Sequence, residues 1–253
     1  MKEKIEVRGL EVRYDGYVAL KNINFKIPHP SFLVIIGPNG AGKTTLLKAL
    51  MGLTPYQGEI EILGKKPKEA REFIGYMPQR DKINTNIPLK VRDVLLMPLL
   101  SKRSFGIRKK DVERAKEALK FVGLQHLWDK DFLSLSGGQQ QRVFFARTLA
   151  MDPKVIILDE PFSAMDVATK MKVVQFLHRL KSSKTIILVT HDINPLAECT
   201  DNVLLLNREV IAFGKTVDVI KEKNIENLYG VRVPIIRMEK VCYLVGSDAH
   251  VHT

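Results

Sequence analysis

One segment of the sequence, residues 37–45, has the residue types and spacing that bind phosphate groups. It fits the pattern G-x-x-x-x-G-K-[ST] between an apolar run and a helical pattern, which is the strand, loop and helix context that this pattern requires. The glycines let backbone N–H groups and a helix N-terminus point at one phosphate chain. A glycine-rich turn with an ordinary surface lysine is the alternative. The expected phosphate-binding residues are Gly37, Pro38, Asn39, Gly40, Ala41, Gly42, Lys43, Thr44 and Thr45.

Two acidic residues, Asp159 and Glu160, follow a second apolar run at 154–158. A carboxylate at the end of a buried strand can hold Mg²⁺ through its water shell, and the hydroxyl of Thr44 can take a place on the ion itself. The next carboxylate can orient and deprotonate the water that attacks a γ-phosphate. In the alternative, Asp159 caps the following helix and Glu160 is a solvated charge. The phosphate loop elsewhere in the chain favours the catalytic interpretation.

A second predicted helix N-terminus lies at the segment Leu135-Ser136-Gly137-Gly138-Gln139. Ser136 is a good N-cap, and the paired glycines leave the N–H groups of the first turn open to an anion. A plain capped helix would not favour this pair, because glycine in a first turn weakens the helix. Two anion-binding helix ends in one chain suggest a nucleotide held between them. A two-fold dimer can achieve this if each subunit supplies one half of each site.

The elements that position these residues follow from hydrophobic patterning. The runs at 154–158 and 185–189 are typical of a parallel sheet that is buried on both faces. Ligands bind beyond the carboxyl ends of such strands. We therefore expect Asp159, Glu160, His191 and the phosphate loop to converge on one site.

The remaining pattern predicts an α/β fold with an antiparallel hairpin at its start, turning at Asp15-Gly16, and a helical insertion from about residue 80 to 132. Tyr14, beside that turn, could stack on a purine or be half buried among its neighbours. Strands are expected at 58–64 and 73–77, helices at 91–100, 109–122 and 167–180, a hairpin-like pair at 203–206 and 210–213, a short helix near 217–223, and one or two strands up to 245.

The composition of the 253 residues, 45% hydrophobic and 27% charged, is that of a soluble globular protein. No apolar run is long enough to span a bilayer, and the start has no apolar segment typical of a secretory signal. Cys199 and Cys242 are too few for a disulfide framework or a zinc cluster. The net charge of +12 is spread along the chain without a nucleic-acid-binding motif. We expect a cytoplasmic protein with no nucleic-acid partner.

Taken together, these motifs resemble the nucleotide-binding subunits of ATP-binding cassette transporters over about the first 230 residues. Five elements occur in the order of that family: the phosphate loop, Gln79, the signature at 135–139, the acidic strand ending in Glu160, and His191. The segment 163–166 is similar to the family's dimer-contact loop, with Met165 where leucine is usual. Tyr14 lies 29 positions before Lys43, as the adenine-stacking aromatic does in relatives.

The resemblance implies a P-loop NTPase core with a mixed sheet, an N-terminal antiparallel β subdomain and an inserted α-helical subdomain at about 80–150. One domain would span residues 1–253, with 203–253 as its C-terminal part. ATP and Mg²⁺ are the implied cofactors. Lys43, Thr44 and Thr45 would bind phosphates and Mg²⁺, and Gln79 would sense the metal and the attacking water. Asp159 would support Mg²⁺, Glu160 would be the general base, and His191 would contact the γ-phosphate.

The implied partners are a second copy of the chain, whose ATP site Ser136, Gly137, Gly138 and Gln139 would complete, and a membrane permease. An extracytoplasmic solute-binding protein would be an indirect partner. The expected location is the cytoplasmic face of the cell membrane. A soluble ATPase of the iron–sulfur assembly type is the alternative, whereas the 92 residues between Lys43 and Ser136 exclude the long coiled coil of repair proteins.

The segment after Gln79 favours an importer. Residues 76–81 and 87–97 are similar to the corresponding run in importers of zinc, manganese and iron, although Pro98-Leu99-Leu100 replaces the Gly-Arg that often follows. His250 and His252 are more typical of a disordered tail than of a metal site.

Overall fold

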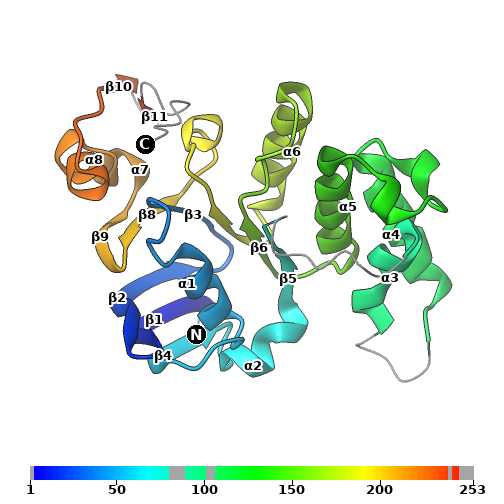
Figure 1. Ribbon diagram of the computed structural model, residues 1–253, viewed down its shortest axis with the longest axis horizontal. Coiled ribbons are helices and arrows are strands. Elements are labelled where there is room, and N and C mark those ends of the chain that lie inside the picture. Colours follow the sequence, from blue (N-terminus) through cyan, green and yellow to red (C-terminus); the bar gives the residue numbers. More distant parts are fainter. Residues whose placement is uncertain (1–2, 80–88, 101–105, 239–240, 245–253) are drawn as a thin grey trace. The chain divides into compact units, whose positions relative to one another are not determined.

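The computed structural model describes residues 3–79, 89–100, 106–238 and 241–244. His250, His252 and the first two residues of the segment at 87–97 lie outside the described residues. The chain divides into two compact units, Met1–Arg71 with Val174–Thr253, and Glu72–Val173. Figure 1 shows the elements of both. We call them the first unit and the second unit and describe each by itself.

The first unit begins with an antiparallel sheet of three strands in the order β2-β1-β4. The strands are β1 (Lys4–Tyr14), β2 (Tyr17–Pro28) and β4 (Gln57–Ile62). The predicted hairpin is confirmed, since Tyr14 pairs with Tyr17 and the chain turns through Asp15 and Gly16, both at positive φ. The alternation of apolar and polar residues buries one face of β1, including Ile5 and Val7.

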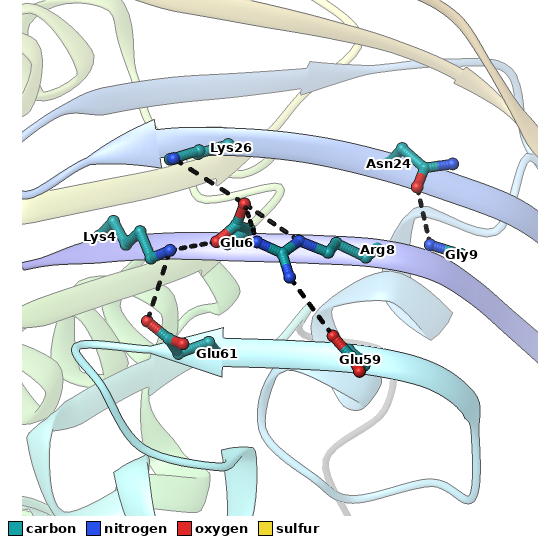
Figure 2. A network of polar contacts seen from close by, with 8 residues as sticks. All are labelled: Lys4, Glu6, Arg8, Gly9, Asn24, Lys26, Glu59 and Glu61. Carbon is teal, nitrogen blue, oxygen red and sulfur yellow. Dashed lines mark hydrogen bonds and ion pairs between the residues drawn. The ribbon is translucent and has the colours of Figure 1, made fainter.

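The opposite face of this sheet carries an ion-pair network centred on Glu6 (Figure 2). The Glu6 carboxylate accepts hydrogen bonds from Lys4 and from two nitrogens of Arg8, at 2.9 and 3.2 Å, and Lys26 lies 3.9 Å away. These opposite charges hold the pKa of Glu6 below its usual value, the hydrogen bond from Lys4 being the largest cause. The network extends to β4 through Glu59 and Glu61.

A mixed sheet in the first unit positions the phosphate loop. The strand β3 (Phe32–Ile36) runs parallel to both β7 (Thr185–Val189) and β8 (Asn202–Asn207), and β9 (Glu209–Gly214) is antiparallel to β8. All residues of β3 and β7 are buried, as the continuous apolar runs predicted. The helix α1 (Lys43–Leu50) follows β3 and buries four of its eight residues.

The first unit also holds shorter elements: α2 (Pro67–Ala70), η5 (Asn194–Leu196), α7 (Thr216–Val219), α8 (Glu222–Tyr229) and the antiparallel pair β10 (Ile235–Met238) and β11 (Val241–Leu244). The prediction of one short helix near 217–223 was wrong, because the chain forms two. Ile220 leaves the helical conformation with ψ at 83°, and its side chain is fully buried. This break lets Val219 and Ile220 both reach the core.

The second unit combines a parallel strand pair with a group of helices. The strands are β5 (Ile74–Met77) and β6 (Val155–Asp159), and the helices are α3 (Val91–Leu100), α4 (Lys109–Phe121) and α5 (Gly137–Ala150). These three helices pack against one another, and each contributes a fully buried side chain: Leu95, Leu119 and Phe145. The 3₁₀ turns are η1 (Arg71–Phe73), which starts at the last residue of the first unit's N-terminal segment, η3 (Gln125–Leu127) and η4 (Phe132–Ser134). The helix α6 (Val167–Leu180) follows β6 and belongs to this unit as far as Val173.

The predicted fold class is confirmed, with an N-terminal antiparallel sheet, a mixed sheet and a helical part between strands. The predicted boundaries at 80–150 and 203–253 stay predictions. Among the described residues, no helix has the length and the hydrophobicity needed to span a bilayer.

Candidate functional site

The shape of the phosphate loop is fixed by its glycines. A Cβ atom on Gly37 would lie 2.1 Å from the carbonyl oxygen of Leu206, and one on Gly42 would lie 2.6 Å from Leu20 Cδ2. Gly40 and Gly42 also have φ values of 77° and 90°, where side chains are strained. The loop is anchored from outside, because the Arg208 N–H donates to the carbonyl of Ala41 at 2.9 Å. This loop conformation therefore requires glycine at these positions.

The start of α1 is suited to an anion. Its N-cap is Gly42, which offers no side-chain hydrogen bond, and no acidic residue lies in the first turn. The N-terminal N–H groups and the positive end of the helix dipole therefore face the loop, and the first turn itself contributes no acidic side chain. Lys43 Nζ donates to the carbonyls of Gly37 and Pro38, at 2.6 and 2.9 Å, so the ammonium lies over the loop. Thr44 and Thr45 are half-buried in the same turn.

His191 belongs to the same edge of the sheet as the phosphate loop. It follows β7, which runs parallel to β3, so both segments leave the carboxyl ends of neighbouring strands. The turn is held by Thr190, whose Oγ1 accepts from the Asp192 N–H at 3.0 Å, and the His191 side chain is exposed. The phosphate loop and His191 therefore follow neighbouring parallel strands, and their convergence on one ligand stays a prediction.

Tyr14 ends β1 with an exposed ring, and its hydroxyl accepts a hydrogen bond from Thr54 Oγ1 at 3.1 Å. This arrangement suits a stacking surface held at one end. Tyr17, which sequence reasoning did not single out, is the cross-strand neighbour of Tyr14 and is also exposed. The guanidinium of Arg208 lies 4.9 Å from the centre of the Tyr17 ring.

In the second unit, the acidic pair and Gln79 share another sheet edge. Asp159 is the last residue of β6 and is almost fully buried, and Glu160 is half-buried. Gln79 follows β5, the parallel neighbour of β6. Burial, together with the charge of Asp159, raises the pKa of the Tyr76 phenol, so this tyrosine stays neutral beside the acid. A buried carboxylate at a strand end is suited to hold a cation.

The signature segment begins α5 as predicted, with Ser136 as N-cap. Ser136 Oγ accepts from the Gln139 N–H at 3.4 Å, and Gln139 Oε1 accepts from the Ser136 N–H at 2.9 Å, which is a capping box. The spacing S-x-x-Q could have predicted it. A Cβ atom on Gly138 would lie 2.5 Å from the carbonyl oxygen of Ala164. Glycine at this position therefore allows the helix to approach the loop at 163–166.

That loop leads into α6, which Asp166 caps. The Thr169 N–H and hydroxyl both donate to the Asp166 carboxylate at 2.8 Å, and these bonds lower the pKa of Asp166. Sequence reasoning missed Gln141, a buried residue of α5. Its side-chain amide forms hydrogen bonds with Glu160, Ser163 and Ala164. A glutamine on the buried face of a helix was the available signal.

The structure therefore gathers the predicted residues into two groups. In the first unit, the phosphate loop and His191 follow the neighbouring strands β3 and β7. In the second unit, Gln79 and the acidic pair lie at the ends of the neighbouring strands β5 and β6, and the signature helix is bonded to Glu160 through Gln141. The predicted meeting of these groups at one nucleotide stays a prediction.

Comparisons with known proteins agree on one family. The family model described as ABC transporter matches residues 20–163. The zinc transport system ATP-binding protein TroB of Treponema pallidum is 40% identical over 233 residues, which cover 90% of this chain and 88% of that protein. The manganese transport system ATP-binding protein MntB of Bacillus subtilis is 39% identical and covers 92% of this chain and 95% of its own length.

Two solved structures are similar over most of the chain. One is a transporter described as metal-chelate type, in an inward-facing conformation, with a TM-score of 0.79, 29% identity and 96% coverage of each chain. The other is a dimeric ATP-binding cassette in a post-hydrolysis state bound to ADP and Pi. Its TM-score is 0.75 and its identity 30%, and the match covers 83% of this chain and 98% of that one.

Proposed function

Because this chain belongs to the ABC transporter family, we propose that it is the ATP-hydrolysing subunit of an importer that takes up a transition-metal ion through a separate permease. The observation that carries the ATPase assignment is the phosphate loop. Its glycines occupy positions where any side chain would clash or strain the backbone, and the helix that follows has no side-chain cap at its N-terminus. Such a turn has little use other than holding phosphate.

ATP binds with its phosphates on the loop and its adenine on Tyr14. The N–H groups at the start of α1 bind phosphate oxygens, and Lys43 exchanges its carbonyl partners for the negative charge of the outer phosphates. His191 contacts the γ-phosphate from the neighbouring strand end. These contacts fix the γ-phosphorus in line with the attacking water.

Mg²⁺ would be held by the Thr44 hydroxyl, the Gln79 amide oxygen and the buried Asp159 carboxylate, because each of these groups is a hard oxygen ligand. When bound, this ion neutralises negative charge on the β- and γ-phosphates. Glu160 accepts a proton from water as the water oxygen bonds to the γ-phosphorus. The bond from that phosphorus to the bridging oxygen breaks, and ADP and phosphate leave.

Two copies of the chain complete the sites. Ser136 to Gln139 of one subunit close over the nucleotide on the phosphate loop of the other, so that ATP binds between subunits. A structural relative that is dimeric and bound to ADP and Pi supports this arrangement. The permease binds the ATPase on the cytoplasmic face of the membrane, and a solute-binding protein delivers the ion from outside.

The cargo proposal depends on relatives, since an ATPase subunit does not touch the solute. The matched proteins named for zinc and manganese transport, each aligned over about nine tenths of this chain, support a transition-metal ion. They also favour the importer over an iron–sulfur assembly ATPase.

Two experiments test these proposals separately. The purified chain should release phosphate from Mg-ATP, and Lys43→Ala should lower the rate about 100-fold or more, as loss of a charge-stabilising group does. A wild-type chain that hydrolyses no ATP, alone or with its permease, would contradict the ATPase assignment.

For the cargo, the neighbouring genes are read for a permease and a solute-binding protein, and the chain is reconstituted with both in vesicles. ATP should drive accumulation of radioactive Mn²⁺ or Zn²⁺, and the Lys43→Ala complex is the matched control. Transport of neither ion, or a gene neighbourhood of iron–sulfur assembly proteins instead of a permease, contradicts the metal-importer proposal.

A further inference from the structure

The side-chain amide of Gln141 forms hydrogen bonds with the loop that follows β6 through both its nitrogen and its oxygen. It lies in α5 and is 2% exposed. Its Nε2 donates to the carbonyl of Glu160 at 2.9 Å and to Ser163 Oγ at 3.1 Å, and its Oε1 accepts from the Ala164 N–H at 2.9 Å. A buried amide with these bonds is costly to replace, because its partners lose their hydrogen bonds as well.

The backbone that Gln141 contacts is itself strained. Glu160 has a φ of 51°, in the left-handed region, which costs a residue with a side chain about 1 kcal/mol or more. Such a conformation persists only when surrounding contacts hold it. The Glu160 carbonyl accepts from Gln141 and also from the Ser163 hydroxyl at 3.3 Å. Because φ at Glu160 sets the direction of its side chain, these bonds also aim the carboxylate.

A second contact joins the same helix to the same loop. The backbone of Gly138 approaches the Ala164 carbonyl so closely that a Cβ atom would lie 2.5 Å from its oxygen. The first turn of α5 thus lies against Ala164, the residue whose N–H donates to Gln141 Oε1. The signature helix and the turn that carries Glu160 are connected at two points within the second unit.

We propose that Gln141 is a positioning residue for ATP hydrolysis, which holds Glu160 in its strained conformation and ties it to the signature helix. This inference rests on the proposed function, in which Glu160 is the base and the signature closes on the partner's nucleotide. A nucleotide bound at the partner's site then acts, through Ser136 and α5, on the geometry of the base in the other site. The two hydrolytic sites of the dimer are coupled by this path.

The test compares Gln141→Met with Gln140→Met in the full-length chain. Gln140 is the adjacent residue and is 8% exposed, and its Nε2 donates to a backbone carbonyl, that of Phe132, at 3.2 Å. Both variants keep the length of the side chain and remove its hydrogen bonds, but only Gln141 contacts the loop that carries Glu160. We measure kcat, the Kd for ATP and the melting temperature.

We expect Gln141→Met to lower kcat about 10-fold or more, as small misplacement of a reacting group does, with the Kd for ATP within about twofold of wild type. Gln140→Met should keep kcat within about twofold, whatever its melting temperature. Equal kcat losses in both variants, or a kcat for Gln141→Met close to wild type, would overturn the inference. The proposed function would still stand in either case, because it depends only on hydrolysis by the wild-type chain.

A second variant keeps the inference testable if Gln141→Met does not fold. Ser163 is exposed, so Ser163→Ala removes one donor to the Glu160 carbonyl without opening a cavity. We expect it to lower kcat about threefold or more with the Kd for ATP unchanged. Unchanged kcat in Ser163→Ala contradicts the proposal.

Discussion

Individual glycines determine the phosphate loop before any ligand is considered. A Cβ atom at Gly37 would meet a backbone carbonyl of β8, and one at Gly42 would meet the side chain of Leu20 on β2. The loop is thus shaped by the strands around it, and α1 begins directly after Gly42, whose φ is positive. At the scale of residues, the anion site is preformed.

The two tyrosines at the end of the hairpin offer a residue-scale prediction. Tyr14→Ala should weaken ATP binding about fivefold, since aromatic stacking contributes about 1 kcal/mol. Tyr17→Ala should leave the affinity for ATP unchanged, because the Tyr17 ring packs against the guanidinium of Arg208 and is not expected to stack on the adenine. Titration of each variant with a fluorescent ATP analogue measures this. Equal weakening in both variants would show that Tyr17 shares the adenine contact.

Most site residues could be predicted from the sequence because a local pattern specifies them. The glycines of the loop, the N-cap Ser136 and the acids after β6 each follow from spacing and flanking residues. Gln141 could not be predicted as a partner of Glu160, since the bond joins residues 19 positions apart on different elements. The same holds for Gly138, whose role depends on the approach of Ala164.

At the scale of elements, α5 depends on a cap that also belongs to the proposed site of the partner. Ser136→Ala removes the acceptor for the Gln139 N–H and should cost about 1 kcal/mol of stability. Hydrolysis should fall much further than this loss explains, because the variant also lacks the hydroxyl that closes on the partner's nucleotide. Urea unfolding and phosphate release on the same preparation separate the two effects.

Asp131→Ala is the matched control for Ser136→Ala. Asp131 caps η4 in the same unit by accepting from the Leu133 N–H at 2.8 Å, and it is exposed. It should lose a similar amount of stability and keep wild-type hydrolysis. If both variants hydrolyse ATP equally well, Ser136 acts only as a cap.

The antiparallel sheet offers a prediction about acid stability (Figure 2). The pKa of Glu6 is lowered in the folded state, below its ordinary value of 4.5. The ionised Glu6 therefore stabilises the fold above pH 4.5, and this contribution disappears as the pH falls through the lowered pKa. Glu6→Gln should destabilise the protein at pH 7, and the difference from wild type in unfolding free energy should shrink toward pH 3.

Urea unfolding at several pH values measures this difference. Glu59→Gln is the control, because Glu59 contributes a single ion pair at 3.6 Å and is more exposed. A difference between Glu6→Gln and wild type that stays constant from pH 7 to pH 3 would show that the ion pairs of Glu6 do not contribute in this way.

At the scale of the whole molecule, the order of elements followed from hydrophobic periodicity, and the pairing of strands did so only in part. The hairpins β1–β2 and β8–β9 were predicted, since neighbouring runs joined by short turns pair with each other. The pairing of β4 with β1 was not predicted, because these strands are separated by β2, β3 and α1. Long-range pairing depends on the packed core and leaves no local pattern.

The central claim is that ATP is bound between two copies of this chain and hydrolysed with Glu160 as base. Glu160→Gln with Mg-ATP tests it most directly, in sedimentation with a parallel phosphate assay. We predict a stable dimer that holds two ATP and releases no phosphate, whereas Lys43→Ala stays monomeric. A Glu160→Gln variant that stays monomeric at saturating ATP, or that hydrolyses ATP at the wild-type rate, would contradict the account.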